Sequence, residues 1–443
     1  MPAATTPDGP EGSKGQGRPD GAPEETDEAD LLELEVGAIA AGGGCVGRAP
    51  DGKVVFVRHS LPGERVRARI TASTTSYLRA DAVEVLTPSP DRVEALCPHA
   101  GPGRCGGCDF QHVALGAQRR LKAFRIAEQL ERLAGLKLDP AVEVEPVAGD
   151  TAGLGWRSRV RVAVDGRGAL GFRRHRSHRL EYVKACPVAS PAVAATGALG
   201  LLWRGATELE VVTGPGSGEA MVTVTPRSRS GPRLPAIDTG VVVAGKVRQP
   251  PGAVHAVVAG RTYRISPGVF WQVHTGAATA LLDAVMELAG PCEGAAVVDL
   301  YAGAGLFSVA LAEAAGPTGS VLAIERDRRA CADARHNGAT FPTLRVLEGD
   351  VTATLVGTAL GRPDIVVLDP AREGAGTDVM RALAEHSPTL RTLIYVSCDP
   401  SSFGRDISVL LAAGWHLTGL RAFDIFPMTE HVELVAGFAP PEG

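Results

Sequence analysis

Apolar and polar residues alternate near the start of the chain, with the period of two that is typical of half-buried β-strands. Short alternating runs stand at residues 53–57 and 65–70, and similar runs fill residues 32–86. Turn-forming sequences separate them, such as Gly42-Gly43-Gly44. Short strands at this spacing predict a small five-stranded β-barrel over residues 32–88.

The next region, residues 89–264, has a mixed pattern. From residue 118 to 136, apolar residues recur at helical spacing with basic residues between them, which predicts an amphipathic helix with a basic face. Nine lysines and arginines lie in residues 156–184, against two acidic residues. Such a run either forms a solvated face or, on a β-hairpin beside the barrel, contacts phosphate groups.

Strand and helix patterns alternate from residue 265 to 443. Apolar runs predict strands at residues 296–300, 321–325, 344–347, 365–369 and 393–398. The stretches between them are long enough for crossover helices, so the pattern favours an α/β fold with a parallel, doubly wound, Rossmann-like sheet. Residues 416–426 and 431–438 predict an antiparallel pair of strands at the edge of that sheet.

Charge and composition narrow the class of protein. A chain of 443 residues with 44% apolar content is expected to form about two to four globular domains. The net charge is −5, but the first 30 residues contain eight acidic and two basic residues, so we predict a disordered acidic tail over residues 1–31. The sequence contains no signal peptide pattern and no apolar run of about 18 residues. We therefore expect a monomeric cytoplasmic protein with no membrane partner.

Two motifs near the C-terminus carry the candidate chemistry. The run Asp369-Pro370-Ala371-Arg372-Glu373-Gly374 follows one predicted strand, and Tyr395-Val396-Ser397-Cys398-Asp399-Pro400 ends the next. In an open α/β sheet the carboxyl ends of the strands line the binding crevice. A lone cysteine is often a packing residue, but the Asp399-Pro400 turn directs Cys398 towards a loop, so we interpret it as a nucleophile.

A glycine turn indicates a cofactor site at the same end of the sheet. Residues 299–305 read Asp-Leu-Tyr-Ala-Gly-Ala-Gly, and Glu325 ends the following strand, where a carboxylate can accept hydrogen bonds from a ribose. Both a nicotinamide cofactor and S-adenosylmethionine are compatible with this glycine turn and acidic residue. The third glycine of the dinucleotide fingerprint is absent, which favours S-adenosylmethionine.

Together these motifs resemble the signature of the RNA (uracil-5-)-methyltransferase family, and the N-terminal strands resemble its TRAM domain, an RNA-binding barrel of the OB type. The resemblance implies methylation of uracil C5 by S-adenosylmethionine. It implies catalytic roles for Cys398, Glu433 and Asp369, cofactor contacts from Gln272, Tyr301, Glu325, Asp350 and Asp369, and substrate contacts from Phe270 and Gln272. Glu430 competes with Glu433 for the role of base, and the family spacing favours Glu433. Leu306 replaces a polar residue of many members.

Four cysteines suggest a second centre. Cys97, Cys105 and Cys108 have the spacing Cys-x7-Cys-x2-Cys, and Cys186-Pro187 supplies a fourth thiol, which suits an iron–sulfur cluster or a structural zinc. The ribosomal-RNA branch of the family has a similar pattern, two residues shorter in the first gap, and holds a [4Fe-4S] cluster. The resemblance therefore favours 23S ribosomal RNA over transfer RNA as substrate. A nicotinamide oxidoreductase and a non-catalytic RNA-binding or redox module are the alternatives.

Overall fold

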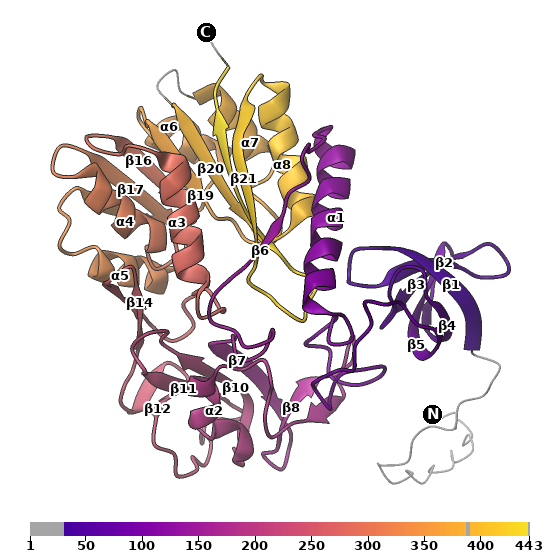
Figure 1. Cartoon of the computed structure of the whole chain (residues 1–443). Helices are drawn as coiled ribbons and strands as arrows, with labels where there is room; N and C mark the ends of the chain where they lie inside the picture. Colours follow the sequence, from indigo (N-terminus) through magenta and orange to yellow (C-terminus); the bar gives the residue numbers. More distant parts are fainter. Residues whose placement is uncertain (1–30, 387–389, 442–443) are drawn as a thin grey trace, which may run out of the picture.

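Five strands at the start of the described chain close into a barrel. The computed structural model describes residues 31–386 and 390–441, and the predicted acidic tail lies outside them except for Leu31. The strands are β1 (Leu31–Ile39), β2 (Cys45–Arg48), β3 (Val54–Arg58), β4 (Arg65–Ser73) and β5 (Tyr77–Thr87). Their order around the barrel is β1-β2-β3-β5-β4, so the predicted barrel is confirmed, and it stands at one side of the molecule (Figure 1).

A seven-stranded sheet forms the lower part of the molecule in Figure 1. Its order is β13-β12-β11-β10-β7-β8-β9, and all neighbours are antiparallel except β11 and β12. The strands are β7 (Arg159–Val164), β8 (Leu170–Arg173), β9 (Leu180–Tyr182), β10 (Ala206–Thr213), β11 (Ala220–Pro226), β12 (Gly240–Val243) and β13 (Lys246–Gln249). Their apolar side chains pack around Trp203 with α2 (Pro191–Ala195) and the short 3-10 helix at Ala198–Gly200. The basic run of residues 156–184 covers β7, β8, β9 and the loops beside them.

The C-terminal sheet has eight strands in the order β18-β17-β16-β19-β20-β22-β21-β6. Its first five are parallel, as predicted: β16 (Ala296–Leu300), β17 (Ser320–Glu325), β18 (Leu344–Glu348), β19 (Ile365–Leu368) and β20 (Thr392–Ser397). β21 (His416–Asp424) and β22 (Glu433–Ala439) are antiparallel to each other. The expectation that these two form the edge is wrong, because β6 (Val144–Pro146) adds to β21 as the outer strand.

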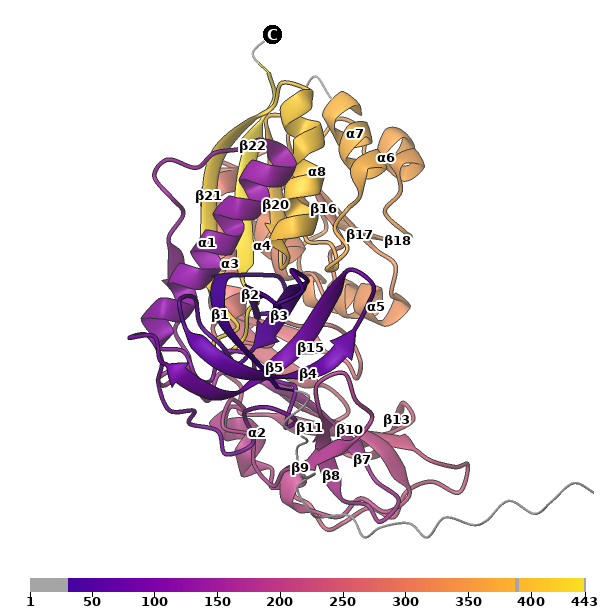
Figure 2. The ribbon, with the colours of Figure 1, turned by 90° about the vertical axis from the view of Figure 1, so that its right-hand side faces the viewer.

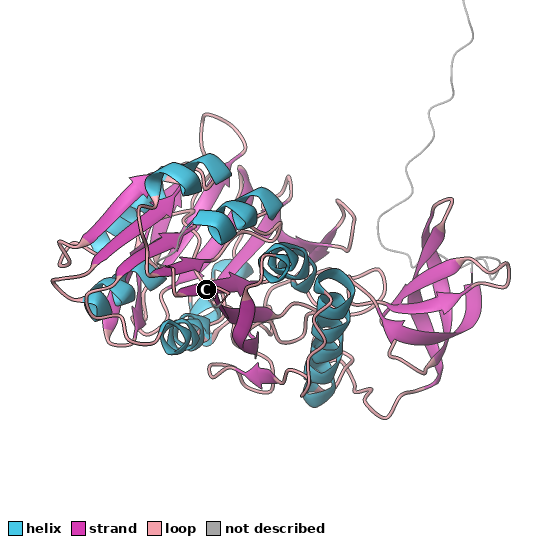
Figure 3. Cartoon of the chain, turned by 90° about the horizontal axis from the view of Figure 1, so that it is seen from above, coloured by secondary structure: helices cyan, strands magenta, loops and turns pink. Residues whose placement is uncertain are grey.

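Helices cover both faces of this sheet, as Figure 3 shows from above. One face packs on α3 (Ala277–Ala289), α4 (Leu306–Ala315) and α5 (Arg328–Asn337), together with the hairpin of β14 (Val254–Val258) and β15 (Arg261–Ile265). The other packs on α1 (Leu115–Ala134), α6 (Ala353–Ala359), α7 (Thr377–His386) and α8 (Pro400–Ala412). Strands covered on both faces must be apolar throughout, which explains the continuous hydrophobic runs of β19 and β20.

Helix α1 links the three parts of the chain. It is the predicted amphipathic helix, and its apolar residues Ile126 and Leu130 are fully buried against the C-terminal sheet. Its Lys122 is also buried and forms an ion pair of 2.5 Å with Asp424 on β21. In Figure 2 the helix runs along the C-terminal sheet beside β21, with the barrel near its start. A segment from the first third of the sequence is therefore part of the C-terminal core.

Candidate active site

The main cavity, of about 780 Å³, opens at the carboxyl ends of β16, β17, β19 and β20. This is the edge at which a doubly wound sheet binds its ligands. The cavity is lined by every residue that the sequence predicts for catalysis, cofactor binding or substrate binding: Phe270, Gln272, Tyr301, Glu325, Asp350, Asp369, Cys398 and Glu433. These residues come from separate segments of the chain, so only the fold brings them together.

The glycine turn after β16 forms one end of this cavity. Tyr301, Gly303 and Gly305 all have positive φ angles, of 61°, 55° and 90°, which allow the chain to turn sharply into α4. The Glu325 carboxylate accepts the N–H of Gly303 at 3.0 Å and that of Asp327 at 2.6 Å. A carboxylate has about four acceptor sites. Glu325 therefore keeps capacity for a ligand hydroxyl while it holds the glycine turn in place.

Aromatic and amide side chains form the opposite wall. Trp271 is buried and its ring packs 5.3 Å from that of Tyr263, which anchors the segment in the core. The neighbouring Phe270 is 62% exposed and Gln272 only 6%, and both line the cavity. Exposure of a large aromatic ring at a cavity mouth provides a stacking surface for a planar ligand. Asp350 is exposed and follows β18 at the far end of the cavity.

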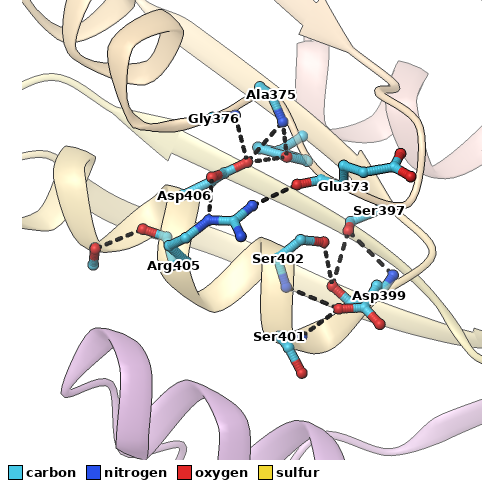
Figure 4. Close-up of polar contacts among 11 residues, drawn as sticks. Glu373, Ala375, Gly376, Ser397, Asp399, Ser401, Ser402, Arg405 and Asp406 are labelled. Atoms are coloured by element: carbon cyan, nitrogen blue, oxygen red, sulfur yellow. Dashed lines mark hydrogen bonds and ion pairs between the residues drawn. The ribbon is translucent and has the colours of Figure 1, made fainter.

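A buried aspartate holds the turn that follows Asp369. Asp406 Oδ2 accepts the Tyr395 hydroxyl at 2.7 Å and the N–H groups of Ala375 and Gly376 at 2.7 and 3.2 Å, and Arg405 bonds its other oxygen (Figure 4). Gly374 has a φ of +84°, and a Cβ there would lie 2.4 Å from Asp406 Oδ2. The glycine of the Asp-Pro-Ala-Arg-Glu-Gly motif is thus required by this close approach.

Cys398 lies between the end of β20 and the start of α8. Asp399 caps the helix by accepting the N–H groups of Ser401 at 2.9 Å and Ser402 at 2.8 Å (Figure 4). Burial, followed by the nearby carboxyls of Glu433 and Asp369, raises the pKa of the Cys398 thiol to about 12. In the ligand-free protein this cysteine therefore carries its proton at neutral pH.

Strand register places Glu433 next to Cys398. In the antiparallel pair of β20 and β22, Ser397 stands opposite Leu434, and Cys398 and Glu433 are the residues that directly adjoin this pair. Both line the main cavity, and the Glu433 carboxyl is close enough to raise the pKa of the Cys398 thiol. Burial and the Asp369 carboxyl raise the pKa of Glu433 well above its ordinary value. Thiol and carboxyl are thus held as neighbours in a site that disfavours negative charge.

Glu430, the competing carboxylate, faces away from this cavity. Its Oε2 accepts the N–H of Gly42 in the barrel at 2.6 Å. Burial and the nearby Asp109 raise the pKa of Glu430, while the bond from Gly42 lowers it. Glu430 therefore attaches the barrel to the C-terminal sheet.

Sequence reasoning assigned no role to two polar side chains of the cavity, Arg372 and His431. Arg372 donates from Nη2 to His431 Nε2 at 3.1 Å. Burial and the Arg372 charge lower the pKa of His431 to about 4, so a neutral imidazole accepts this bond. Both residues stand inside the quoted motifs, but only the structure brings these two segments together.

The four predicted metal ligands gather around a second cavity. Cys97, Cys105, Cys108 and Cys186 all line a space of about 150 Å³ beside β7 and β8. Burial, with a contribution from the neighbouring thiols, raises the pKa of Cys105 to about 11 and of Cys108 to about 12. Within the described residues, no group of three or more His, Cys, Asp or Glu side chains is arranged to hold a metal ion. The cluster and zinc assignments remain predictions.

The basic run is partly neutralised by the neighbouring strand. Arg161 on β7 pairs with Glu208 at 3.6 Å and with Glu210 at 3.1 Å, and Arg174 pairs with Glu181 at 3.2 Å. Among residues 31–386 and 390–441, no helix is long and apolar enough to cross a membrane.

Fold and cavity together define a Rossmann-like methyltransferase sheet preceded by an OB-type barrel and a mixed central region. Residues 30–83 match the model of the TRAM domain. In fold the chain is similar to the Pyrococcus abyssi tRNA (uracil-54, C5)-methyltransferase in complex with S-adenosyl-L-homocysteine, with a TM-score of 0.68, 22% identity, and coverage of 92% of this chain and 99% of that one.

Two curated relatives extend the similarity to sequence. An uncharacterized RNA methyltransferase of Streptomyces avermitilis is 46% identical, over 92% of this chain and 98% of its own. The 23S rRNA (uracil(1939)-C(5))-methyltransferase RlmD of Shewanella denitrificans is 31% identical, over 88% of this chain and 92% of its own. The chain therefore belongs to the RNA (uracil-5-)-methyltransferase family and is an RNA methyltransferase.

Proposed function

We propose that the protein methylates C5 of a uridine in 23S ribosomal RNA and uses S-adenosylmethionine as methyl donor. The observation that carries this proposal is the juxtaposition of Cys398 and Glu433 across β20 and β22, in the cavity that also contains the glycine turn. Uracil C5 is a weak nucleophile, so its methylation requires both a thiol and a base. The relative from Shewanella supports ribosomal RNA as the substrate.

The residues of the cavity divide into two ends. Glu325 and the turn at residues 301–305 would hold the ribose and adenosine part of the cofactor, and Asp350 the adenine side. When bound, S-adenosylmethionine supplies the methyl group and a positive sulfonium charge. Phe270 would stack on the extruded uracil, Gln272 would contact both ligands, and Asp369 would face the uracil edge.

Catalysis would begin when the Cys398 thiol gives its proton to solvent and Sγ adds to C6 of the uracil. Electron density would then shift to C5, which would take the methyl group as the bond between that carbon and the sulfonium sulfur breaks and S-adenosylhomocysteine is left. Glu433, in its ionised form, removes the C5 proton, and the resulting elimination breaks the bond between sulfur and C6. A positive charge in the cavity favours the thiolate and carboxylate forms that this sequence needs.

We also propose a [4Fe-4S] cluster at the four cysteines and a cytoplasmic, monomeric protein. A tetrahedral zinc would hold its sulfurs about 3.8 Å apart. Four thiols share one cavity, and the spacing of three close cysteines with a remote Cys186-Pro187 favours a four-thiolate iron–sulfur cluster over zinc. The two extra residues between Cys97 and Cys105 fit into a turn, in which the Cys105 N–H donates to the His99 carbonyl at 3.1 Å.

The test uses full-length protein purified without oxygen, methyl-labelled S-adenosylmethionine, unmodified 23S ribosomal RNA and bulk transfer RNA. We expect 5-methyluridine in ribosomal RNA, lost in Cys398→Ala and kept in Cys292→Ala, which alters a buried packing cysteine. Glu433→Gln should accumulate a methylated covalent complex of protein and RNA. Label in transfer RNA alone would overturn the substrate, and full activity of Cys398→Ala would overturn the mechanism.

A further inference from the structure

The loop between β21 and β22, residues 425–432, is held from outside the active site. On one side it supplies Phe426 and His431 to the main cavity and leads into Glu433. On the other side, the Met428 carbonyl accepts two N–H groups, from Asp109 at 3.0 Å and from Phe110 at 2.9 Å. Met428 has a φ of +66°, which a residue other than glycine keeps only when its surroundings hold it. We call residues 425–432 the catalytic loop.

Gln118 on α1 completes the attachment. Its side chain is fully buried and accepts the Met428 N–H at 2.8 Å. Its amide nitrogen donates to the carbonyls of Phe110 at 3.1 Å and Val113 at 2.9 Å. One side chain therefore joins the catalytic loop to residues 109–113, and these bonds share a buried network in which the loss of one weakens the others.

The same segment begins at the cysteine cavity. Cys108 precedes Asp109 directly in the chain, and Cys108 and Cys186 pack with Met428 and Phe426 around the buried Trp156. A displacement of these two cysteines would therefore reach the catalytic loop through both the backbone and this small core, since close-packed side chains transmit shifts.

A poorly satisfied amide lies in the cysteine cavity. Gln111 is 3% exposed and lines this cavity with the four thiols. Neither its side-chain oxygen nor its nitrogen makes a hydrogen bond of ordinary geometry within the described residues, and its polar neighbour in the cavity is the Cys108 thiol, whose pKa it lowers. A thiol is a weak hydrogen-bond partner, so a stronger polar partner in the cavity would satisfy the buried amide better.

We propose that residues 108–111 couple the four-cysteine site to the catalytic loop, so that the group bound by the cysteines positions Glu433 and His431 for methyl transfer. Gln118 and Met428 act as positioning residues in this coupling. The proposal rests on the proposed function, because it needs a bound group at the cysteines and Glu433 as the base. It gives the cysteine site a role in catalysis without contact to either substrate.

The experiment compares the full-length protein before and after anaerobic removal of iron by a chelator. Iron and acid-labile sulfide are counted in both samples. Amide exchange is measured at residues 428–433, alongside kcat and the Kd for S-adenosylmethionine. Removal of iron should speed exchange in the catalytic loop and lower kcat by about 100-fold, as a misplacement of about 1 Å does. The Kd for S-adenosylmethionine should stay the same, because the glycine turn follows β16 and is not part of the catalytic loop.

Gln118→Leu tests the coupling without touching the cysteines or the cavity. It should show fast loop exchange and low kcat with its iron retained, and iron removal should then change neither. The control is Gln249→Leu. Gln249 is a half-buried glutamine on the remote strand β13, and its side-chain amide donates to the Ile237 carbonyl. If the protein binds iron but amide exchange in the catalytic loop is the same before and after iron removal, the coupling is overturned. Protein that never binds iron would overturn the cofactor assignment and, with it, this proposal.

Discussion

Replacing Asp369 by asparagine should stabilise the ligand-free protein while it abolishes methyl transfer. Burial, followed by the nearby Asp299 carboxyl, raises the pKa of Asp369 from 3.8 to about 7. A carboxyl with a raised pKa in the folded state binds its proton more tightly there, so ionising it destabilises the fold. This destabilisation is absent below about pH 4, grows as the pH rises, and is complete above about pH 7.

The magnitude follows from the same pKa. A rise from 3.8 to about 7 corresponds to about 4 kcal/mol, at about 1.36 kcal/mol per pKa unit. The Glu433 carboxyl competes with Asp369 for the same proton, so part of this free energy belongs to Glu433 and is not recovered by changing Asp369 alone. We therefore expect Asp369→Asn to stabilise the ligand-free protein by about 2–4 kcal/mol at pH 8 and by much less at pH 5.

Thermal unfolding of the wild type and of Asp369→Asn, at pH 5 and at pH 8 without cofactor, measures this difference. The gap in Tm should be wide at pH 8 and narrow at pH 5. Asp299→Asn removes the carboxyl that helps to raise the pKa of Asp369, so Asp369→Asn should stabilise the protein less in an Asp299→Asn background than in the wild type. An Asp369→Asn variant with the same Tm as the wild type at both pH values, or a lower one at pH 8, would refute the reasoning.

Three further substitutions test how the active site is held. Lys122→Met leaves the buried Asp424 without its cation and should destabilise the protein by about 3–5 kcal/mol. Denaturant unfolding measures this loss, and adding Asp424→Leu should restore most of it. Asp406→Ala leaves the Tyr395 hydroxyl and the Gly376 N–H without their acceptor, and the Ala375 N–H with only the Tyr395 oxygen, so it should lower both Tm and kcat, with a stability loss of about 3 kcal/mol. Gly374→Ala adds a Cβ at a φ of +84°, so it should lower kcat and reduce the stability by about 1–3 kcal/mol. Unchanged kinetics in this variant would contradict the close approach of residue 374 to Asp406.

The sequence by itself determined the elements of the catalytic sheet and most candidate side chains. Strands covered on both faces have to be apolar at every position, and this pattern is visible in β19 and β20. The glycine turn and the Asp-Pro motif are short-range features, because the conformation they require depends on neighbouring residues. The five-stranded barrel was predictable for the same reason.

Tertiary structure alone decided which side chains meet. The short strand β6 joins the C-terminal sheet from more than a hundred residues upstream of β16, and no local pattern contains that pairing. The positions of the two candidate bases also depend on the fold, which places the Glu430 carboxylate on the Gly42 N–H and Glu433 in the cavity with Cys398. The contacts of residues 108–110 with Met428 in the catalytic loop could not be predicted from the sequence either. Hydrogen bonds between distant segments depend on packing and leave no periodic signal in the chain.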